Sequence, residues 1–397
     1  MGCASSSEAA TPVAPPQGVP VKKHHAKSVT AGTEAMALTT HTISNEPAVE
    51  PETNMTVKLG TVQYRIAAKS QKGKDPEVPT KPNQDCFSMN AVGEGGDSYF
   101  FGVYDGHGPT GEQCSQLVQQ HLHKLVTRNM AKHTDDVGLP LHKAHIEVNE
   151  ILRSSSVNDA LSGTTAISVL LHDSNKITVS NVGDSRAVLG STLPGTLQAA
   201  PLSKDQTPYR KDEAARCQSR GARILSFGQI RPDPDDDPEV EDPPRVWHPE
   251  LNMPGTAFTR SIGDSVAEPL GVCAEPECLT VPLTEHENLI LLASDGVFDV
   301  MTNQQVAELA YMHKDDPEKA CEAIIKKSYE EWLINDDCVG DEEHANYDDM
   351  TVLVIFVDHP NSTKEVSTTS TEHPRPHKRV RQKTLRNMEE MSEFTGQ

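Results

Sequence analysis

The chain has 397 residues, enough for one large domain or two ordinary ones, and 36 Lys and Arg against 58 Asp and Glu give it a formal net charge of −22. This balance argues against nucleic-acid binding, because a phosphate backbone requires a long, clustered basic face. The apolar fraction is 36% and the aromatic fraction 4%, so we expect part of the chain to stay outside any core. No run of about 18 apolar residues predicts a transmembrane helix, and we expect no signal peptide.

The eight cysteines are scattered and form no Cys-x-x-Cys pair, which argues against a zinc or redox motif and favours a reducing, intracellular compartment. A Gly-x4-Gly-Lys-Ser/Thr loop is also missing, and Gly93, Gly95 and Gly96 predict a turn between strands.

Composition divides the chain into three regions. Residues 1–56 are rich in Ala, Ser, Thr, Pro and Glu and predict a disordered N-terminal arm. Residues 57–358 carry the apolar periodicity of a folded domain. Residues 359–397 are polar, with a Ser/Thr run and a basic stretch at 375–386, and predict a disordered tail.

The apolar pattern inside the domain predicts strands and helices in separate blocks. In chain order we expect a strand around 62–66, a strand at 99–104, a helix at 114–126, strands at 166–171, 177–182 and 289–293, helices at 304–312 and 317–332, and a strand at 351–357. Because strands arrive in consecutive pairs, we expect an α+β fold with antiparallel sheets and helices packed outside.

Four segments place an aspartate at a strand end or turn. They are Asn83-Gln84-Asp85, Asp105-Gly106-His107-Gly108, Ser294-Asp295-Gly296 and Tyr347-Asp348-Asp349. A carboxylate beside an exposed carbonyl suits Mg²⁺ or Mn²⁺, which prefer oxygen ligands. A single Asp-Gly pair after a strand is more often an ordinary turn, and the spacing alone does not name a reaction.

Seven segments, in order, resemble the motifs of the metal-dependent type-2C (PPM-type) serine/threonine protein phosphatases. They begin at Asn83, Phe101, Ser162, Asn181, Thr259, Ala293 and Asp348 and read NQDCF, FGVYDGHG, SGTTA, NVGDSR, TRSIGD, ASDGVFD and DDMT. The resemblance covers roughly residues 57–358. It implies two packed antiparallel β-sheets flanked by α-helices, an α-β-β-α sandwich, and hydrolysis of phosphoserine and phosphothreonine in phosphoprotein substrates.

The resemblance also implies a set of metal ligands. Asp105 would bridge two ions, Mg²⁺ or Mn²⁺, and the carbonyl of Gly106 would bind one of them. Asp295 and Asp348 would complete the shell, and Asp85 would hold a metal-bound water. Two such ions make hydroxide available near neutral pH for attack on phosphorus.

Further roles follow from the same resemblance. Asp184 and Asp299, together with Asp295, match positions that hold a third metal in some members. His107 would be the general acid that protonates the leaving serine or threonine oxygen, with a turn histidine as the alternative.

Other matched positions are expected to be structural. Gly163 and Thr164 would serve a strand turn and its packing, and Asp264 would hold a turn by hydrogen bonds. Arg186 would orient Asp184.

Some positions depart from the family's pattern. Many members carry an arginine five residues before the aspartate matched by Asp85, where it grips the substrate phosphate; here Thr80 is followed by Lys81. Lys81 is the candidate phosphate ligand, as a point charge without the bidentate fork of arginine. Gln206 stands in place of the family's histidine, and Gln84 in place of a frequent glutamate.

These departures leave rival functions open. One rival is a catalytically silent relative that binds phosphoproteins, although such a protein would be expected to have lost at least one of Asp105, Asp295 and Asp348. The other is a hydrolase of small phosphoesters at the same site.

An acidic, proline-rich segment follows Arg231. Five prolines between Pro232 and Pro244 exclude regular structure and predict a loop beside the region that the family calls the flap. The loop is either a solvated connection or a selector for phosphosites with basic flanks.

The two ends of the chain suggest a location. Residues 1–6 fit the N-myristoylation pattern at Gly2, and Cys3 offers a second, palmitoylated anchor, which favours the cytoplasm and the cytoplasmic face of a membrane. The basic stretch at 375–386 is either a nuclear address or a contact with anionic lipid. We expect a monomer.

Overall fold

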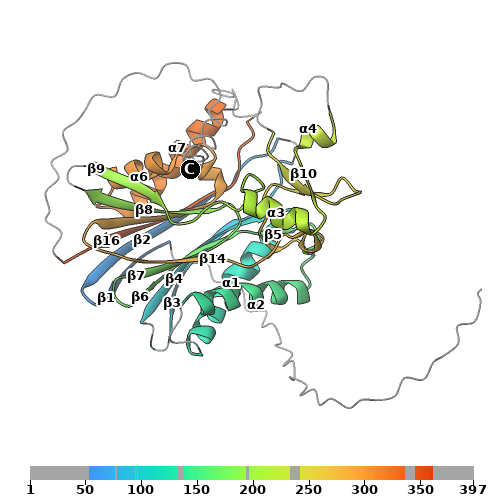
Figure 1. Cartoon of the computed structure of the whole chain (residues 1–397). Helices are drawn as coiled ribbons and strands as arrows, with labels where there is room; N and C mark the ends of the chain where they lie inside the picture. Colours follow the sequence, from blue (N-terminus) through green and yellow to red (C-terminus); the bar gives the residue numbers. More distant parts are fainter. Residues whose placement is uncertain are drawn as a thin grey trace, which may run out of the picture. The chain divides into compact units, whose positions relative to one another are not determined.

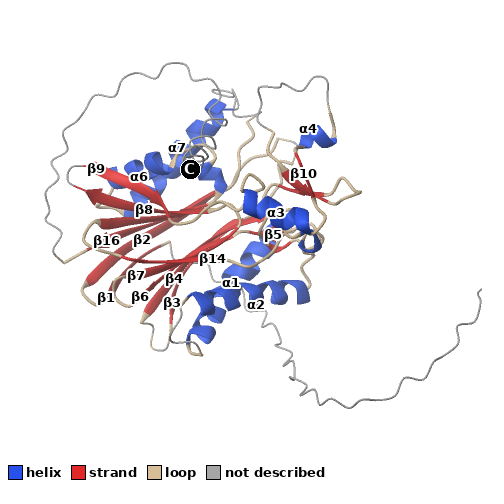
Figure 2. Ribbon diagram, in the orientation of Figure 1, coloured by secondary structure: helices blue, strands red, loops and turns tan. Residues whose placement is uncertain are grey.

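Two antiparallel sheets form the centre of the described part of the chain (Figures 1 and 2). The computed structural model describes residues 53–360, apart from positions 77, 94, 96, 133–136, 194–195, 233–241 and 336–344. The first sheet has the order β1 (Asn54–Leu59), β2 (Val62–Gln71), β16 (Met350–Asp358), β15 (Glu287–Ala293), β8 (Arg186–Leu193) and β9 (Thr196–Pro201).

The strands of the second sheet lie, in chain order, between β2 and β8 and between β9 and β15. Its order is β13 (Ile262–Gly263), β5 (Gly163–Thr164), β4 (Ser98–His107), β6 (Ala166–His172), β7 (Lys176–Val182) and β14 (Glu277–Pro282), and β3 (Asp85–Val92) pairs with β4. A small third sheet has the order β10 (Arg223–Leu225), β11 (Arg245–Trp247) and β12 (Pro254–Thr256).

Helices cover the outer face of each large sheet. Helices α1 (Gly111–Met130) and α2 (Gly138–Ser154) pack on the second sheet, and α6 (Asn303–Met312) and α7 (Pro317–Asn335) pack on the first. The short elements are α3 (Lys211–Ser219), α4 (Phe227–Ile230), η1 (Glu268–Leu270) and α5 (Asp295–Phe298).

The layers follow from side-chain alternation along each strand. In β4, Phe101 and Val103 point into the core between the sheets, whereas Phe100 and Tyr104 point to the core under α1 and α2. All four are 0% exposed. The α-β-β-α sandwich is therefore confirmed, because both faces of each central strand are buried.

The predicted strands and helices are confirmed, with small differences at their ends. Strand β1 begins at Asn54, before the expected boundary at residue 57, because residues 54–59 pair with β2. Helix α2 was not predicted, although Leu141, Ala144, Val148 and Leu152 lie at helical spacing and are fully buried. Residues 1–52 of the N-terminal arm, the tail from residue 361 onward and positions 233–241 of the acidic segment lie outside the described residues.

The described residues contain no helix long and apolar enough to cross a membrane.

Candidate active site

The predicted metal ligands meet where strand ends of the two large sheets come together. Asp85 and Asp105 are direct partners in the β3–β4 ladder of the second sheet. Asp295 begins α5 directly after β15, and Asp348 precedes β16, so these two come from the first sheet. The Ser294 hydroxyl connects the sheets by donating a 2.7 Å hydrogen bond to Asp85 Oδ2.

These carboxylates gather negative charge that Lys81, at the edge of the set, offsets only in part. Burial, reinforced by neighbouring carboxylates, raises the pKa of Asp85 to about 7 and the pKa values of Asp105 and Asp295 well above the usual range. Asp85 Oδ1 and Asp295 Oδ1 are buried, and neither has a hydrogen-bond partner among the described residues. Buried oxygens of this kind fit hard divalent cations, which would supply the missing positive charge.

The predicted third-metal residues lie beside this set. Burial, then Asp205 and Asp299, raises the pKa of Asp184 to about 7. Arg186, expected to orient Asp184, makes its ion pair with Asp205, and its Nε lies 2.9 Å from Asp205 Oδ1. Asp205 therefore holds the guanidinium, a contact that the sequence did not predict.

The backbone at Gly106 lies close to the backbone of Gly111 and Gln84. A Cβ there would overlap the carbonyl oxygens of Gly111 and Gln84, so only glycine leaves room for the loop. The Gln84 amide also donates a 2.7 Å hydrogen bond to the Gly108 carbonyl. Gln84, one of the departures from the family's pattern, therefore supports the loop that carries Asp105 and Gly106.

Asp349 has a different role from its neighbour Asp348. Its side chain is buried and accepts hydrogen bonds from the backbone N–H groups of Gly73, at 2.6 Å, and Gln84, at 2.8 Å. Asp349 thus anchors the chain before β3. The side chain of Asp348, in contrast, is 47% exposed and lies at the site. The sequence offered no signal to tell the two aspartates apart.

Lys81 reaches the edge of the carboxylate set. Its Nζ lies 3.4 Å from Asp348 Oδ1 and 3.8 Å from Asp349 Oδ2. Burial works against its charge, but the two aspartates outweigh burial and raise its pKa. Thr80 is an exposed turn residue, so Lys81 is the cation that this segment brings to the site.

His107 is held by residues far away in the sequence. Its Nε2 lies 2.6 Å from Asp264 Oδ2, and its ring centroid lies 4.3 Å from that of Phe258. The Asp264 side chain is 3% exposed, and the residue has φ = +52°, a conformation that aspartate tolerates better than most residues. Asp264 does hold a turn as expected, because its carbonyl accepts hydrogen bonds from the N–H groups of Ala267 and Glu268, but its side chain also binds the candidate general acid.

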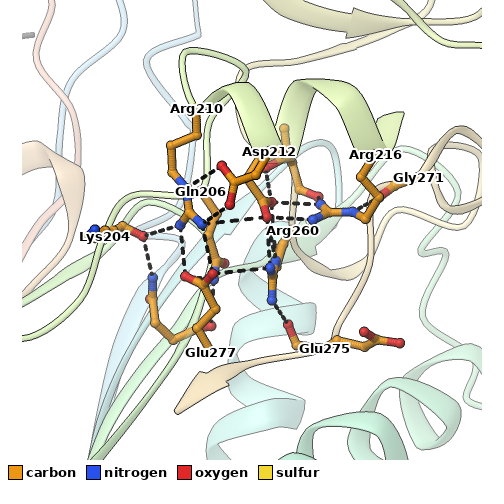
Figure 3. A network of polar contacts seen from close by, with 12 residues as sticks. Lys204, Gln206, Arg210, Asp212, Arg216, Arg260, Gly271, Glu275 and Glu277 are labelled. Carbon is orange, nitrogen blue, oxygen red and sulfur yellow. Dashed lines mark hydrogen bonds and ion pairs between the residues drawn. The ribbon is translucent and has the colours of Figure 1, made fainter. Parts of the chain in front are cut away.

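A second acidic group lies elsewhere and is already neutralised (Figure 3). Asp212, Glu213 and Glu277 have carboxylate oxygens within 4.8 Å of one another. Arg210 binds Asp212 and Glu277, and Arg260 binds Glu213 at 2.8 Å. These ion pairs attach α3 to β14. Because the arginines already balance the charge of the three carboxylates, the group does not require a metal ion.

Gln206 belongs to this network. It is 0% exposed, accepts a 2.7 Å hydrogen bond from Gly183 N–H, and donates to the Asn181 carbonyl and Glu277. The departure at this position is therefore structural and leaves the candidate metal ligands intact.

Known proteins resemble this chain in sequence. The family described as "Protein phosphatase 2C" matches residues 82–333. "Probable protein phosphatase 2C 35" of Arabidopsis thaliana is 40% identical over 298 residues, which cover 72% of this chain and 82% of the relative. "Probable protein phosphatase 2C 64" of Oryza sativa subsp. japonica is 30% identical over 327 residues, which cover 79% of this chain and 72% of that relative.

Solved structures share the fold at low sequence identity. A serine-threonine phosphatase 2C from Toxoplasma gondii has a TM-score of 0.61 at 18% identity and covers 78% of this chain and 100% of its own. A C. elegans sex determining protein has a TM-score of 0.58 at 20% identity, and the match covers 76% of this chain and 65% of that protein's chain.

The chain belongs to the protein phosphatase 2C family. It is a serine/threonine protein phosphatase, a metal-dependent hydrolase whose substrates are phosphoproteins.

Proposed function

We propose that the chain hydrolyses phosphoserine and phosphothreonine with a water activated by two divalent ions, Mg²⁺ or Mn²⁺. Asp105, the Gly106 carbonyl, Asp295 and Asp348 would hold the ions, and Asp85 would hold a water in their shell. When bound, two such ions lower the pKa of a water so that hydroxide is available near neutral pH. The observation that carries this proposal is the pair of buried, unpartnered oxygens on Asp85 and Asp295.

Lys81 and His107 complete the proposed reaction. Lys81 lies at the rim of the carboxylate set and would bind the substrate phosphate. His107 would donate a proton to the leaving serine or threonine oxygen, while Asp264 keeps its ring in place. Asp184 and Asp299 would hold a third ion with Asp295.

The experiment measures metal binding and hydrolysis on the same protein. Asp105→Asn should weaken Mn²⁺ binding in calorimetry and lower turnover of a phosphothreonine peptide at least about 10²-fold, and chelator should abolish turnover of the wild type. Asp315→Asn changes an exposed carboxylate between α6 and α7 and serves as the control. Full activity of Asp105→Asn, or of the wild type in chelator, would contradict the two-metal assignment.

The same assays separate the rival functions. A silent phosphoprotein-binding relative would bind the phosphopeptide without releasing phosphate, and a small-ester hydrolase would cleave p-nitrophenyl phosphate while leaving the peptide intact. The complete set of Asp85, Asp105, Asp295 and Asp348 supports the phosphatase over the silent relative.

We further propose that Gly2 and Cys3 carry acyl chains that attach the enzyme to the cytoplasmic face of a membrane. The support is the sequence pattern at residues 1–6, with two adjacent acceptors. Two chains are needed because a single myristoyl group binds membranes only marginally.

A further inference from the structure

A pocket lies on the small sheet formed by β10, β11 and β12. Its volume is about 310 Å³, and the residues around it include Phe227, Arg231, Arg245, Trp247, Asn252 and Gly255. Two of these side chains are cationic and none of the described lining residues is acidic. This is unusual in a chain whose net charge is −22, and it indicates a local site for an anion.

The guanidinium of Arg245 has unused hydrogen-bonding capacity. Its Nη1 donates a 3.1 Å hydrogen bond to the Gly255 carbonyl, but its Nε is buried and has no partner among the described residues. The nearest acid along the described chain, Asp242, lies near enough to feel the charge of Arg245, but its carboxylate accepts hydrogen bonds from the N–H groups of Phe227 and Gly228. A carboxylate or phosphate oxygen would satisfy such a donor.

Aromatic side chains form the rest of the wall. The Trp247 indole donates a 2.8 Å hydrogen bond to the Leu225 carbonyl, which fixes the ring, and Phe227 lies 6.3 Å from it between centroids. A Cβ on Gly255 would lie 2.6 Å from the Trp247 ring, so glycine is required beside it. Arg231 lies 5.9 Å above the Phe227 ring. Arg231 is exposed, and its contact with the Phe227 ring places the charge over this wall.

The pocket is connected to the candidate active site through a short stretch of chain. Gly255 lines the pocket, and Phe258, three residues further on, lies against His107 with a 4.3 Å centroid separation. Three residues span at most about 11 Å even when fully extended. A substrate segment with its phosphoresidue at His107 would therefore reach the pocket within about three to six residues, at about 3.3 Å per residue.

We infer that this arginine pocket, defined by Arg231 and Arg245 on the aromatic wall of Phe227 and Trp247, binds an acidic side chain of the phosphoprotein substrate, about three to six residues from the phosphoserine or phosphothreonine. The inference rests on the proposed phosphatase function and adds a substrate class to it: phosphosites with acidic flanks. It opposes the expectation that the acidic segment after Arg231 selects basic flanks, and the same measurement decides between them.

The test compares two phosphothreonine peptides of equal length, one with glutamates and one with lysines three to six residues from the phosphothreonine. The ratio of their kcat/KM values, measured on one protein sample, does not depend on how much of the sample is folded. We expect the wild type to favour the glutamate peptide about tenfold at low salt. Arg231→Gln should reduce this ratio about threefold or more, Arg231→Lys should retain most of it, and Arg231→Gln with Arg245→Gln should remove it.

Arg220→Gln is the matched control, because Arg220 is an exposed arginine at the end of α3 that does not line the pocket. Its ratio should equal that of the wild type. Fluorescence anisotropy of both peptides in chelator repeats the comparison without hydrolysis, so loss of catalysis does not hide the result. A ratio at or below one in the wild type, or one that both arginine substitutions leave unchanged, would overturn the inference. Absence of turnover on both peptides would instead count against the proposed function.

Discussion

Asp264 Oδ2 lies 2.6 Å from Nε2 of His107, although 157 residues separate the two in the chain. The aspartate belongs to the turn after β13 and the histidine ends β4, and the two strands are joined only through β5. This contact fixes the ring of the candidate general acid at the edge of the carboxylate set.

Asp264→Asn should therefore lower turnover of a phosphothreonine peptide about tenfold and affect p-nitrophenyl phosphate much less. The alkoxide leaving group needs the proton, whereas nitrophenolate does not. Asp159→Asn is a suitable control, because Asp159 binds Ser265 in the same turn without a direct contact to His107 among those described. Equal losses on both substrates for Asp264→Asn would assign the residue to the turn alone.

His107→Ala should show the same dependence on the leaving group, with a larger effect. We expect a loss of about 10²–10⁴-fold on phosphoserine or phosphothreonine peptides and a much smaller loss on an aryl phosphate. Steady-state kinetics with both substrates measure this difference. A histidine that only supports the turn would reduce both rates by the same factor.

Ser294→Ala should weaken metal binding without removing any proposed ligand. The Ser294 hydroxyl donates to Asp85 Oδ2 at 2.7 Å and accepts from Thr351 N–H at 3.0 Å, so it sets the position of Asp85. Loss of such an outer contact costs about ten- to hundredfold in metal affinity. Calorimetric titration with Mn²⁺ checks this, and Ser180→Ala, which breaks a buried serine pair between β6 and β7, should leave the affinity unchanged.

Glu213→Gln should destabilise the fold by about 3 kcal/mol, because it leaves buried arginine charge without its partner. Burial alone would raise the pKa of Glu213, but hydrogen bonds from Arg216, Arg260 and Thr259 outweigh it and lower the pKa from 4.5 to about 2. Since the pKa is lower in the folded state, this stabilisation is fully present above pH 4.5 and is lost as the pH falls toward 2. Urea unfolding at several pH values measures both effects.

The control for that experiment is Asp212→Asn, because Asp212 is exposed and binds Arg210 at the surface. It should cost less than about 1 kcal/mol. A Glu213→Gln protein as stable as the wild type would mean that the arginines find other partners.

Gly2→Ala should move the enzyme from the membrane fraction to the soluble fraction, and Cys3→Ser should do so in part. Without the glycine neither acyl chain is expected, whereas without the cysteine the myristoyl chain alone gives marginal binding. Cell fractionation with an antibody against the catalytic domain measures the distribution. Identical distributions of the wild type and both variants would disprove the anchor.

The sequence by itself determined the sandwich and the family. Residues 99–104 and 166–171 are near-continuous apolar runs, and such runs predict strands buried on both faces whatever their neighbours. The aspartates beside strand ends could be predicted as ligands because each motif is local: Asp105, Asp295 and Asp348 are recognised from residues beside them.

Only the tertiary structure decided the partners of these residues. The contacts of Asp264 with His107, Ser294 with Asp85, and Asp349 with the backbone of Gly73 and Gln84 join segments that no periodicity relates. A hydrogen bond depends on the position of two atoms to within a few tenths of an ångström, and that position is set by how the two sheets pack. Local pattern therefore specifies which residues carry the chemistry, and packing specifies which residues hold them in place.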